Sequence, residues 1–252
     1  MTPEHLLVPY QCSELPPGPW LVFAPHADDE TFGMGGALIK AAAQGIDTHV
    51  VVMTDGALGG DAASLVDVRQ SEVRQACQQL GVRSLQCWDQ PDRGLGSDPA
   101  QTELLTERIA ARVAELNAAT VFFPGVLELH PDHRSTAMLV WRGMQKLQDR
   151  PWRGVLPQLW SYEISVQSPV NRLIDITDVR AQKEQVMAVY VSQNSQNNYP
   201  ELILALNKAR TFSLPPQVSH AEAFYVYSAA QVAMPLRRAA EQALAIYWGH
   251  EN

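Results

Sequence analysis

Short apolar segments alternate with longer segments of helical periodicity along most of the chain. Such alternation, with short connections, is typical of a mostly parallel sheet whose crossover helices cover both faces. The pattern predicts an α/β fold, namely a single-domain, Rossmann-like, doubly wound sheet. The predicted strands are 21–24, 47–56, 84–90, 120–124, 158–165, 171–178 and 223–228, and the predicted helices are 31–45, 66–82, 102–118, 133–148, 179–193 and 230–247.

The chain has 252 residues, of which 46% are hydrophobic, which is sufficient for one large core. It contains no internal repeat and no linker long enough to require a second domain. We therefore expect one domain over residues 1–252. The proline-containing segment 1–19 is expected to be an extended lead-in, and segment 229–252 a closing helix.

Charge and composition argue against several classes of partner. The net charge is −8 and no basic stripe is present, so neither nucleic acid nor an anionic membrane surface is an expected partner. No apolar run approaches the length of a membrane span, and the first residues lack the pattern of a signal peptide. Cys12, Cys77 and Cys87 are odd in number and lack CxxC spacing, which favours reduced thiols and a cytoplasmic protein.

Two clusters of acids and histidines each follow a predicted strand. APHADDE (24–30) follows the strand at 21–24, and LHPDH (129–133) follows the strand at 120–124. The carboxyl edge of a parallel sheet is where ligands bind, so the two clusters are expected to meet there. They supply the candidate site residues His26, Asp28, Asp29, His130, Asp132 and His133.

This set of side chains suits a divalent metal ion. Two histidines and one carboxylate are typical ligands of catalytic zinc, and His26, Asp29 and His133 can supply them. The same ligands also suit iron, cobalt or manganese. The charge of the ion would stabilise the crowded carboxylates. Asp28 would then lie beside the metal, where it could take a proton from a bound water.

Simpler interpretations exist for individual residues. Asp28 or Asp29 could cap the following helix, and capping is the favoured role of Asp132 at the start of the next one. Trp88 falls in WDQPDRG near the expected pocket, where its ring could stack on a sugar, although most tryptophans lie in the core. The presence of two clusters at equivalent strand ends favours the metal interpretation for the set.

The chain resembles the LmbE-like or PIG-L-like N-acetylglucosaminyl deacetylases, whose two signature motifs are similar to APHADDE and LHPDH. Similarity continues through VRQSEVRQACQQLGV, QPDRGL, SYEI and NRLIDIT, so that it covers about residues 20–225. The resemblance implies a zinc-dependent hydrolase that removes acetyl groups from N-acetylated sugars and their conjugates. It also implies a homo-oligomer, either a trimer or a hexamer.

Roles for individual residues also follow from this resemblance. It implies that zinc is bound by His26, Asp29 and His133, that Asp28 is the general base, that His130 stabilises the oxyanion, and that Arg69 and Asp92 serve the substrate site. Two positions depart from the family pattern, since Ala27 stands where proline is usual and Ala57 where an acid is frequent. Loops 56–66, 89–100 and 192–200 are expected to shape the acceptor site.

Other functions remain open at this level. A metal amidase that acts on another amide, such as a thiol conjugate or an antibiotic, would use the same residues. A non-catalytic scaffold is disfavoured because all the reacting groups are present. A dinucleotide-binding function has still less support, because GMGGA (33–37) is not a GxGxxG motif at a strand–helix turn.

Overall fold

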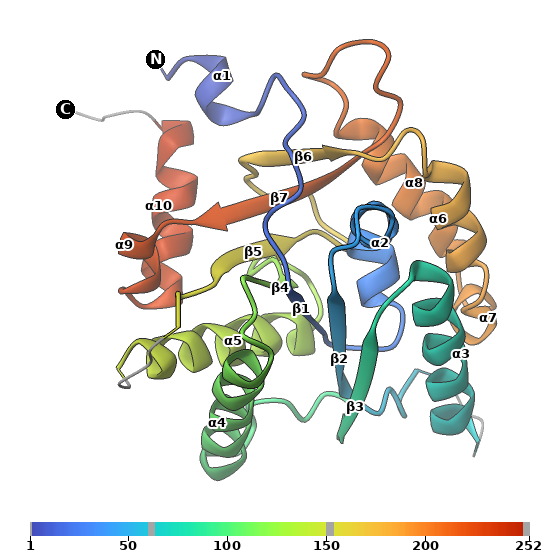
Figure 1. Cartoon of the computed structure of the whole chain (residues 1–252), viewed down its shortest axis with the longest axis vertical. Helices are drawn as coiled ribbons and strands as arrows, with labels where there is room; N and C mark the ends of the chain where they lie inside the picture. The colour runs from blue at the N-terminus through green and yellow to red at the C-terminus, as the bar shows by residue number, and fades with distance from the viewer. Residues whose placement is uncertain (1, 60–63, 150–153, 249–252) are drawn as a thin grey trace.

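The computed structural model describes residues 2–59, 64–149 and 154–248 and contains one seven-stranded sheet (Figure 1). The strand order is β3-β2-β1-β4-β5-β7-β6. Strands β1 to β5 run parallel, whereas β7 is antiparallel to both β5 and β6. The strands are β1 Trp20–Ala24, β2 Thr48–Thr54, β3 Ser84–Gln90, β4 Thr120–Pro124, β5 Gln158–Tyr162, β6 Arg172–Asp175 and β7 Ala221–Tyr227.

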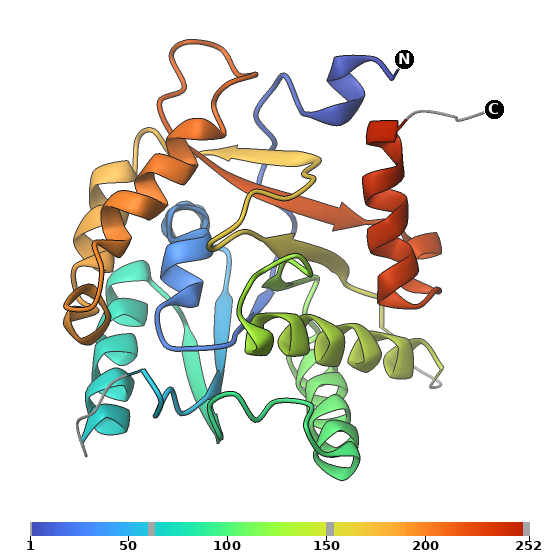
Figure 2. The same ribbon diagram turned by 180° about the vertical axis from the view of Figure 1, so that it is seen from behind.

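Helices cover both faces of the sheet, as Figures 1 and 2 show. One face packs against α2, α3, α6 and α8, and the other against α4, α5, α9 and α10. The predicted doubly wound α/β fold is therefore confirmed. The helices are α1 Glu4–Leu7, α2 Asp29–Ala43, α3 Leu65–Leu80, α4 Pro99–Leu116, α5 Pro131–Gln148, α6 Arg180–Met187, α7 Val191–Asn194, α8 Tyr199–Ala209, α9 Ala229–Val232 and α10 Leu236–Trp248.

The central position of β1 in the sheet explains why its sequence, WLVFA, is apolar at every position. Leu21 and Phe23 enter the core beneath α4 and α5, whereas Trp20, Val22 and Ala24 enter the core beneath α2 and α3. A central parallel strand is buried on both faces, so a continuous apolar run replaces the alternation of a half-exposed strand.

The order of the strands reverses at β1. The chain passes from β1 to β2 and β3 on one side, and β4 then pairs with β1 on the other side. Such a reversal opens a crevice at the carboxyl ends of the two strands. The segments that follow β1 and β4 both enter this crevice, and they carry the two acid–histidine clusters.

Several predicted boundaries are wrong. The lead-in contains the short helix α1, the predicted helix 179–193 is divided into α6 and α7, and the loop 192–200 includes most of α7 and the start of α8. Division of α6 from α7 places Tyr190 fully in the core, where its hydroxyl bonds Glu30. The closing helix is divided into α9 and α10 near Pro235, which has no N–H to continue a helix. Residues 249–252 of that prediction lie outside the described chain.

Helix α2 is kinked at Met34, whose backbone angles are not helical (φ −147°, ψ 25°). A buried ion pair satisfies the backbone groups that flank the kink. Glu222 accepts from the N–H groups of Gly36 and Ala37, both at 2.7 Å. Lys183 Nζ donates to Phe32 O at 2.9 Å and to Glu222 Oε1 at 2.7 Å. The pair thus acts as an internal cap for the kinked helix.

We expect Lys183→Met to lower the free energy of unfolding by about 3–5 kcal/mol, because Glu222 would remain charged and unpaired in the core. Lys183 and Glu222 have fully buried side chains, whereas the partner of Lys40, Asp178, is 66% exposed. Lys40→Met is therefore the matched control, with a cost of at most about 1 kcal/mol. Urea unfolding of the two variants measures the difference. Equal stabilities would show that the buried pair does not support α2.

Candidate active site

The segment after β1 places two candidate ligands side by side. His26 Nδ1 lies 3.2 Å from Asp29 Oδ2, and the backbone N–H of His26 donates to the same oxygen at 2.9 Å. Asp29 is the first residue of α2. Asp28 between them has a φ of 136°, a conformation that costs non-glycine residues on the order of 1–3 kcal/mol and is common in active sites.

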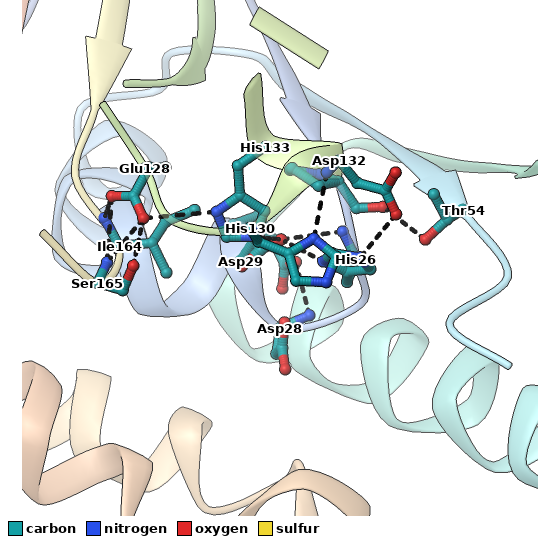
Figure 3. Close-up of polar contacts among 12 residues, drawn as sticks. His26, Asp28, Asp29, Thr54, Glu128, His130, Asp132, His133, Ile164 and Ser165 are labelled. Carbon is teal, nitrogen blue, oxygen red and sulfur yellow. Dashed lines mark hydrogen bonds and ion pairs between the residues drawn. The ribbon is translucent and has the colours of Figure 1, made fainter. Parts of the chain in front are cut away.

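The segment after β4 brings the second cluster to the same place. His133 Nε2 lies 3.2 Å from Asp29 Oδ2, so that this oxygen contacts both His26 and His133. One nitrogen each of His26, His130 and His133 lies within 4.8 Å of the others. The structure therefore brings together the residues that the two motifs predict, although the clusters are about 100 residues apart in the sequence (Figure 3).

Carboxylates lie behind the two histidines that contact Asp29. His26 Nε2 is 3.4 Å from Asp132 Oδ2 and 3.5 Å from Asp92 Oδ1. On the other side of the cluster, His133 Nδ1 is 3.5 Å from Glu128 Oε2. A carboxylate on the outer nitrogen is the usual support of a metal-binding histidine, since it orients the ring and fixes its tautomer. The three histidines beside Asp29 thus have a spacing that fits a divalent metal ion.

The helix-capping prediction for Asp132 is wrong. The cap of α5 is His130, whose Nδ1 accepts from the backbone N–H of Asp132 at 3.2 Å. The Asp132 carboxylate instead accepts from the backbone N–H of Arg93 at 2.6 Å and faces His26. Its side chain is 1% exposed. Burial next to a histidine therefore takes precedence over the local preference of an acid for a helix start.

His130 differs from the other two histidines in its protonation. Burial lowers the pKa of His130, and the positive charges of His26 and His133 lower it further. The neutral imidazole carries one proton, and the helix cap uses Nδ1 as an acceptor, so the proton resides on Nε2. His130 is among the residues that line the central cavity, to which it offers a neutral N–H donor.

The pKa values of the two adjacent acids, Asp28 and Asp29, are shifted in opposite directions. Burial raises the pKa of Asp28, and the negative charge of Asp29 raises it further, although Arg69 opposes the shift. Burial also favours the neutral form of Asp29, but the charges and hydrogen bonds of His133 and His26 outweigh it and hold that pKa well below its usual range. Two carboxyl groups with separated pKa values are typical of a site with one fixed charge and one proton carrier.

A cavity of about 810 Å³ opens above these groups. Arg69 lines it, although 4% exposed, and donates from Nη1 to Gly56 O at 3.1 Å. Arg69 Nε has no hydrogen-bond partner within the described part of the chain. Asp92 also lines the cavity, and its Oδ2 accepts from the backbone N–H of Leu58 at 3.1 Å. Both residues that the resemblance assigns to the substrate site thus reach it.

Trp88 does not reach the site, and the prediction that it stacks on a sugar is wrong. Its side chain is 4% exposed and packs edge-on against Phe23, with ring centroids 5.9 Å apart. Arg108 covers the ring at 4.0 Å. In β3 the tryptophan points toward the core beneath α4, and it is not among the described residues that line the cavity.

All three loops that the sequence singles out contribute to the cavity. Leu58 and Gly59 come from the first, Asp92 and Arg93 from the second, and Gln193 from the third. Residues 60–63 of the first loop lie outside the described chain. The first and third loops are also joined directly, since the side-chain amide of Gln196 donates to the backbone oxygen of Gly59.

Sequence reasoning missed two contributors to the site. Glu128 lies two positions before His130 in LELH, and its carboxylate accepts from Ile164 N at 2.8 Å and Ser165 N at 3.1 Å. Helix α8 was not predicted, although Tyr199, Leu202 and Leu206 line the cavity. Its apolar spacing after Pro200 was the available signal.

Comparison with known proteins agrees with the geometry. Residues 21–144 match the family model described as PIG-L, GlcNAc-PI de-N-acetylase. The resemblance drawn from the two motifs is therefore confirmed. Within the described residues, no helix has the length and apolar character that crossing a membrane requires.

The named relatives of this chain are distant. It is 26% identical over 145 residues to a probable N-acetyl-alpha-D-glucosaminyl L-malate deacetylase 2 of Bacillus cereus, covering 52% of this chain and 64% of that protein. It is 29% identical over 127 residues to a diacetylchitobiose deacetylase of Thermococcus kodakarensis, covering 47% and 46%. The matched part thus spans less than two thirds of either relative.

The fold of this chain is shared with a solved structure. The conserved protein TT1542 from Thermus thermophilus superimposes with a TM-score of 0.71 and 26% identity, covering 86% of this chain and 94% of that one. The similarity therefore extends well beyond the matched family segment.

We expect Glu128→Gln to weaken the binding of a divalent metal about 10- to 100-fold, because His133 would lose the carboxylate behind its outer nitrogen. Glu72→Gln is the matched control, since Glu72 is also buried and also accepts from a backbone N–H of another element, that of Ser192 in α7 at 2.8 Å. Competition titration with a chelating dye measures both affinities. The expectation fails if Glu128→Gln binds zinc as tightly as Glu72→Gln.

Proposed function

We propose that this protein is a metal-dependent N-deacetylase, which hydrolyses the acetamide of an N-acetylated amino sugar or glycoconjugate to acetate and a free amine. The observation that supports it best is the meeting of His26 and His133 on one carboxylate oxygen of Asp29, with Asp28 adjacent. Both named relatives carry deacetylase names.

In this proposal the metal is zinc, and its ligands are His26, Asp29 and His133. Two histidines and a carboxylate leave a position open for water or substrate in catalytic zinc sites. The deacetylases of this family are metalloenzymes. When bound, a divalent ion supplies Lewis acidity, which polarises the acetamide carbonyl and lowers the pKa of water toward neutrality.

Asp28 is the proposed proton carrier. Its side chain lines the cavity next to Asp29, and its raised pKa suits a group that both accepts and returns a proton. Asp28 accepts a proton from the attacking water and then delivers it to the departing amine nitrogen. Asp29 remains ionised throughout, because its pKa is already low in the metal-free protein and a bound divalent ion would take the place of the histidine charges that lower it.

His130 is the proposed oxyanion donor. Its Nε2–H donates to the acetamide oxygen, where negative charge develops as water adds to the carbonyl. A neutral imidazole is sufficient for this role. One such donor typically contributes about 3–4 kcal/mol to the stabilisation of the transition state.

Arg69 and Asp92 are proposed to bind and shape the sugar end of the substrate. The buried Nε of Arg69 lacks a hydrogen-bond partner in the described residues, which suits a group kept available for a polar substrate atom. Asp92 holds Leu58 in the first loop and thereby fixes one wall of the cavity. Its role is therefore to shape the site as well as to contact the ligand.

Three broader expectations belong to the same proposal. We expect one domain over residues 1–252, a cytoplasmic location, and a homo-oligomer that is a trimer or a hexamer. The three cysteines are free, as expected for a reducing compartment. Sedimentation velocity tests the oligomer, and fractionation of cells tests the location.

The direct test is acetate release from a panel of N-acetylglucosamine derivatives by the purified protein, with metal content measured in parallel. We expect about one zinc per chain, activity that a chelator removes, and recovery on adding zinc. Turnover of another amide with no acetate release would favour the metal amidase instead. A protein that binds metal and hydrolyses no amide would favour the scaffold.

We expect Asp28→Asn to reduce kcat by about 10²- to 10⁴-fold, since the amide cannot accept the proton. Zinc content should be unchanged, because Asp28 is not among the proposed ligands. Asp178→Asn removes the same charge from an exposed position and is the control. Retention of full activity in Asp28→Asn would falsify the role of this residue.

A further inference from the structure

The cavity has two chemically distinct parts. Its floor holds the candidate catalytic groups, including His26, Asp28 and His133. Much of the rest is apolar and comes from five separate segments of the chain. The apolar lining residues are Phe32, Leu58, Leu129, Ile164, Tyr199, Leu202, Ile203 and Leu206. The sugar-binding role assigned above uses only the polar part.

Helix α8 supplies half of this apolar wall. Tyr199, Leu202, Ile203 and Leu206 have the i, i+3, i+4, i+7 spacing of one helix face, and all four line the cavity. Asn207 lies off this stripe and instead accepts from Lys183 Nζ at 3.0 Å in the protein interior. One edge of the stripe, at Tyr199 and Ile203, also packs against the core, whereas Leu202 is exposed on the cavity side.

The wall leaves much apolar surface in contact with water. Leu129 is 73% exposed, Leu58 is 59% exposed and Leu202 is 52% exposed. They come from three different segments of the chain and meet around the same cavity. An exposed apolar patch of this kind next to polar catalytic groups is typical of a ligand-binding site. The volume of about 810 Å³ lies in the upper part of the range of ligand pockets.

We propose that this wall, defined by α8 residues 199–206 with Leu58, Leu129 and Ile164, is a subsite for an apolar chain carried by the substrate. The inference rests on the proposed deacetylase function, and it narrows the substrate class to amphipathic amides. The acetamide or amide carbonyl lies at the histidine cluster, and the chain extends along α8. Such a chain has two possible sources, an apolar group at the anomeric carbon of the sugar or an N-acyl group longer than acetyl.

A matched series of substrates tests the subsite and separates the two sources. The series is the methyl and hexyl glycosides of N-acetylglucosamine, and the methyl glycoside of N-hexanoylglucosamine. Burial of one methylene changes a binding constant about fourfold. We therefore expect partial burial of the added carbons to lower KM by at least about tenfold for the chain that fits. A gain for the hexyl glycoside identifies the anomeric source, and a gain for the N-hexanoyl compound identifies the acyl source.

Variants connect any gain to the wall. Leu202→Gln and Leu129→Gln change exposed side chains, so both proteins should fold, and both should reduce the preference for the hexyl chain to below about threefold, since each side chain provides part of the apolar contact. Leu104→Gln is the matched control, because Leu104 is 68% exposed on α4 and is not among the lining residues. It should retain the full preference.

Calorimetric binding of the hexyl glycoside distinguishes failure of this inference from failure of the proposed function. Tight binding that Leu202→Gln weakens, in the absence of any turnover, would support the subsite and overturn the deacetylase. Turnover of all three compounds with equal KM, or a preference that Leu104→Gln removes as much as Leu202→Gln does, would overturn the subsite and leave the deacetylase in place.

Discussion

The buried ion pair between Lys183 and Glu222 determines how α2 can present the active-site acids. Helix α2 must turn at Met34, and a turn inside a helix leaves backbone groups without partners. Glu222 in β7 accepts two of the freed N–H groups and Lys183 in α6 donates to a freed carbonyl. The first turn of the helix, which begins at Asp29, is thereby held at its own angle to the rest. A buried pair often adds little net stability, but here each partner also satisfies backbone groups that would otherwise be orphaned.

Without a metal ion, the site at the start of α2 carries more positive charge than it would if its histidines were neutral. Burial lowers the pKa of His133, but Asp29 and Glu128 outweigh it and raise that pKa to about 9. The pKa of His26 is also raised well above its usual value, because bonds to Asp132, Asp29 and Asp92 outweigh burial. Both imidazoles therefore carry protons at neutral pH when no metal is bound. Metal must displace these protons, so its apparent affinity should increase as pH rises toward 9.

What could be predicted from the sequence was mainly local. The motifs at 24–30 and 129–133 adjoin apolar strands, so the fold rule for parallel sheets was enough to bring His26 and His133 together. Trp88 could not be placed, because the side of β3 on which it lies depends on the register with β2 and on the cover that α4 provides. The kink at Met34 depends on Glu222, 186 residues from Gly36, and no local pattern indicates it. Helix α8 was missed for another reason, since the amide-rich stretch before it read as one long loop.

Helix α8 contributes both to the network that holds α2 and to the wall of the substrate cavity. Asn207 on one side accepts from Lys183 and so belongs to the network that holds α2. Leu202 and Leu206 on another side line the cavity, and Leu202 is exposed. Because these positions are separated around the helix, side chains at 202 and 206 can change the fit of a substrate without breaking the contact to Lys183. Substitution of Asn207 would instead break the contact to Lys183. It would shift the position of the catalytic acids through α2 and leave the contacts to the ligand unchanged. A chain bound along α8 would also pack against the helix that carries Asn207, so substrate shape and the position of Asp29 are linked through one element.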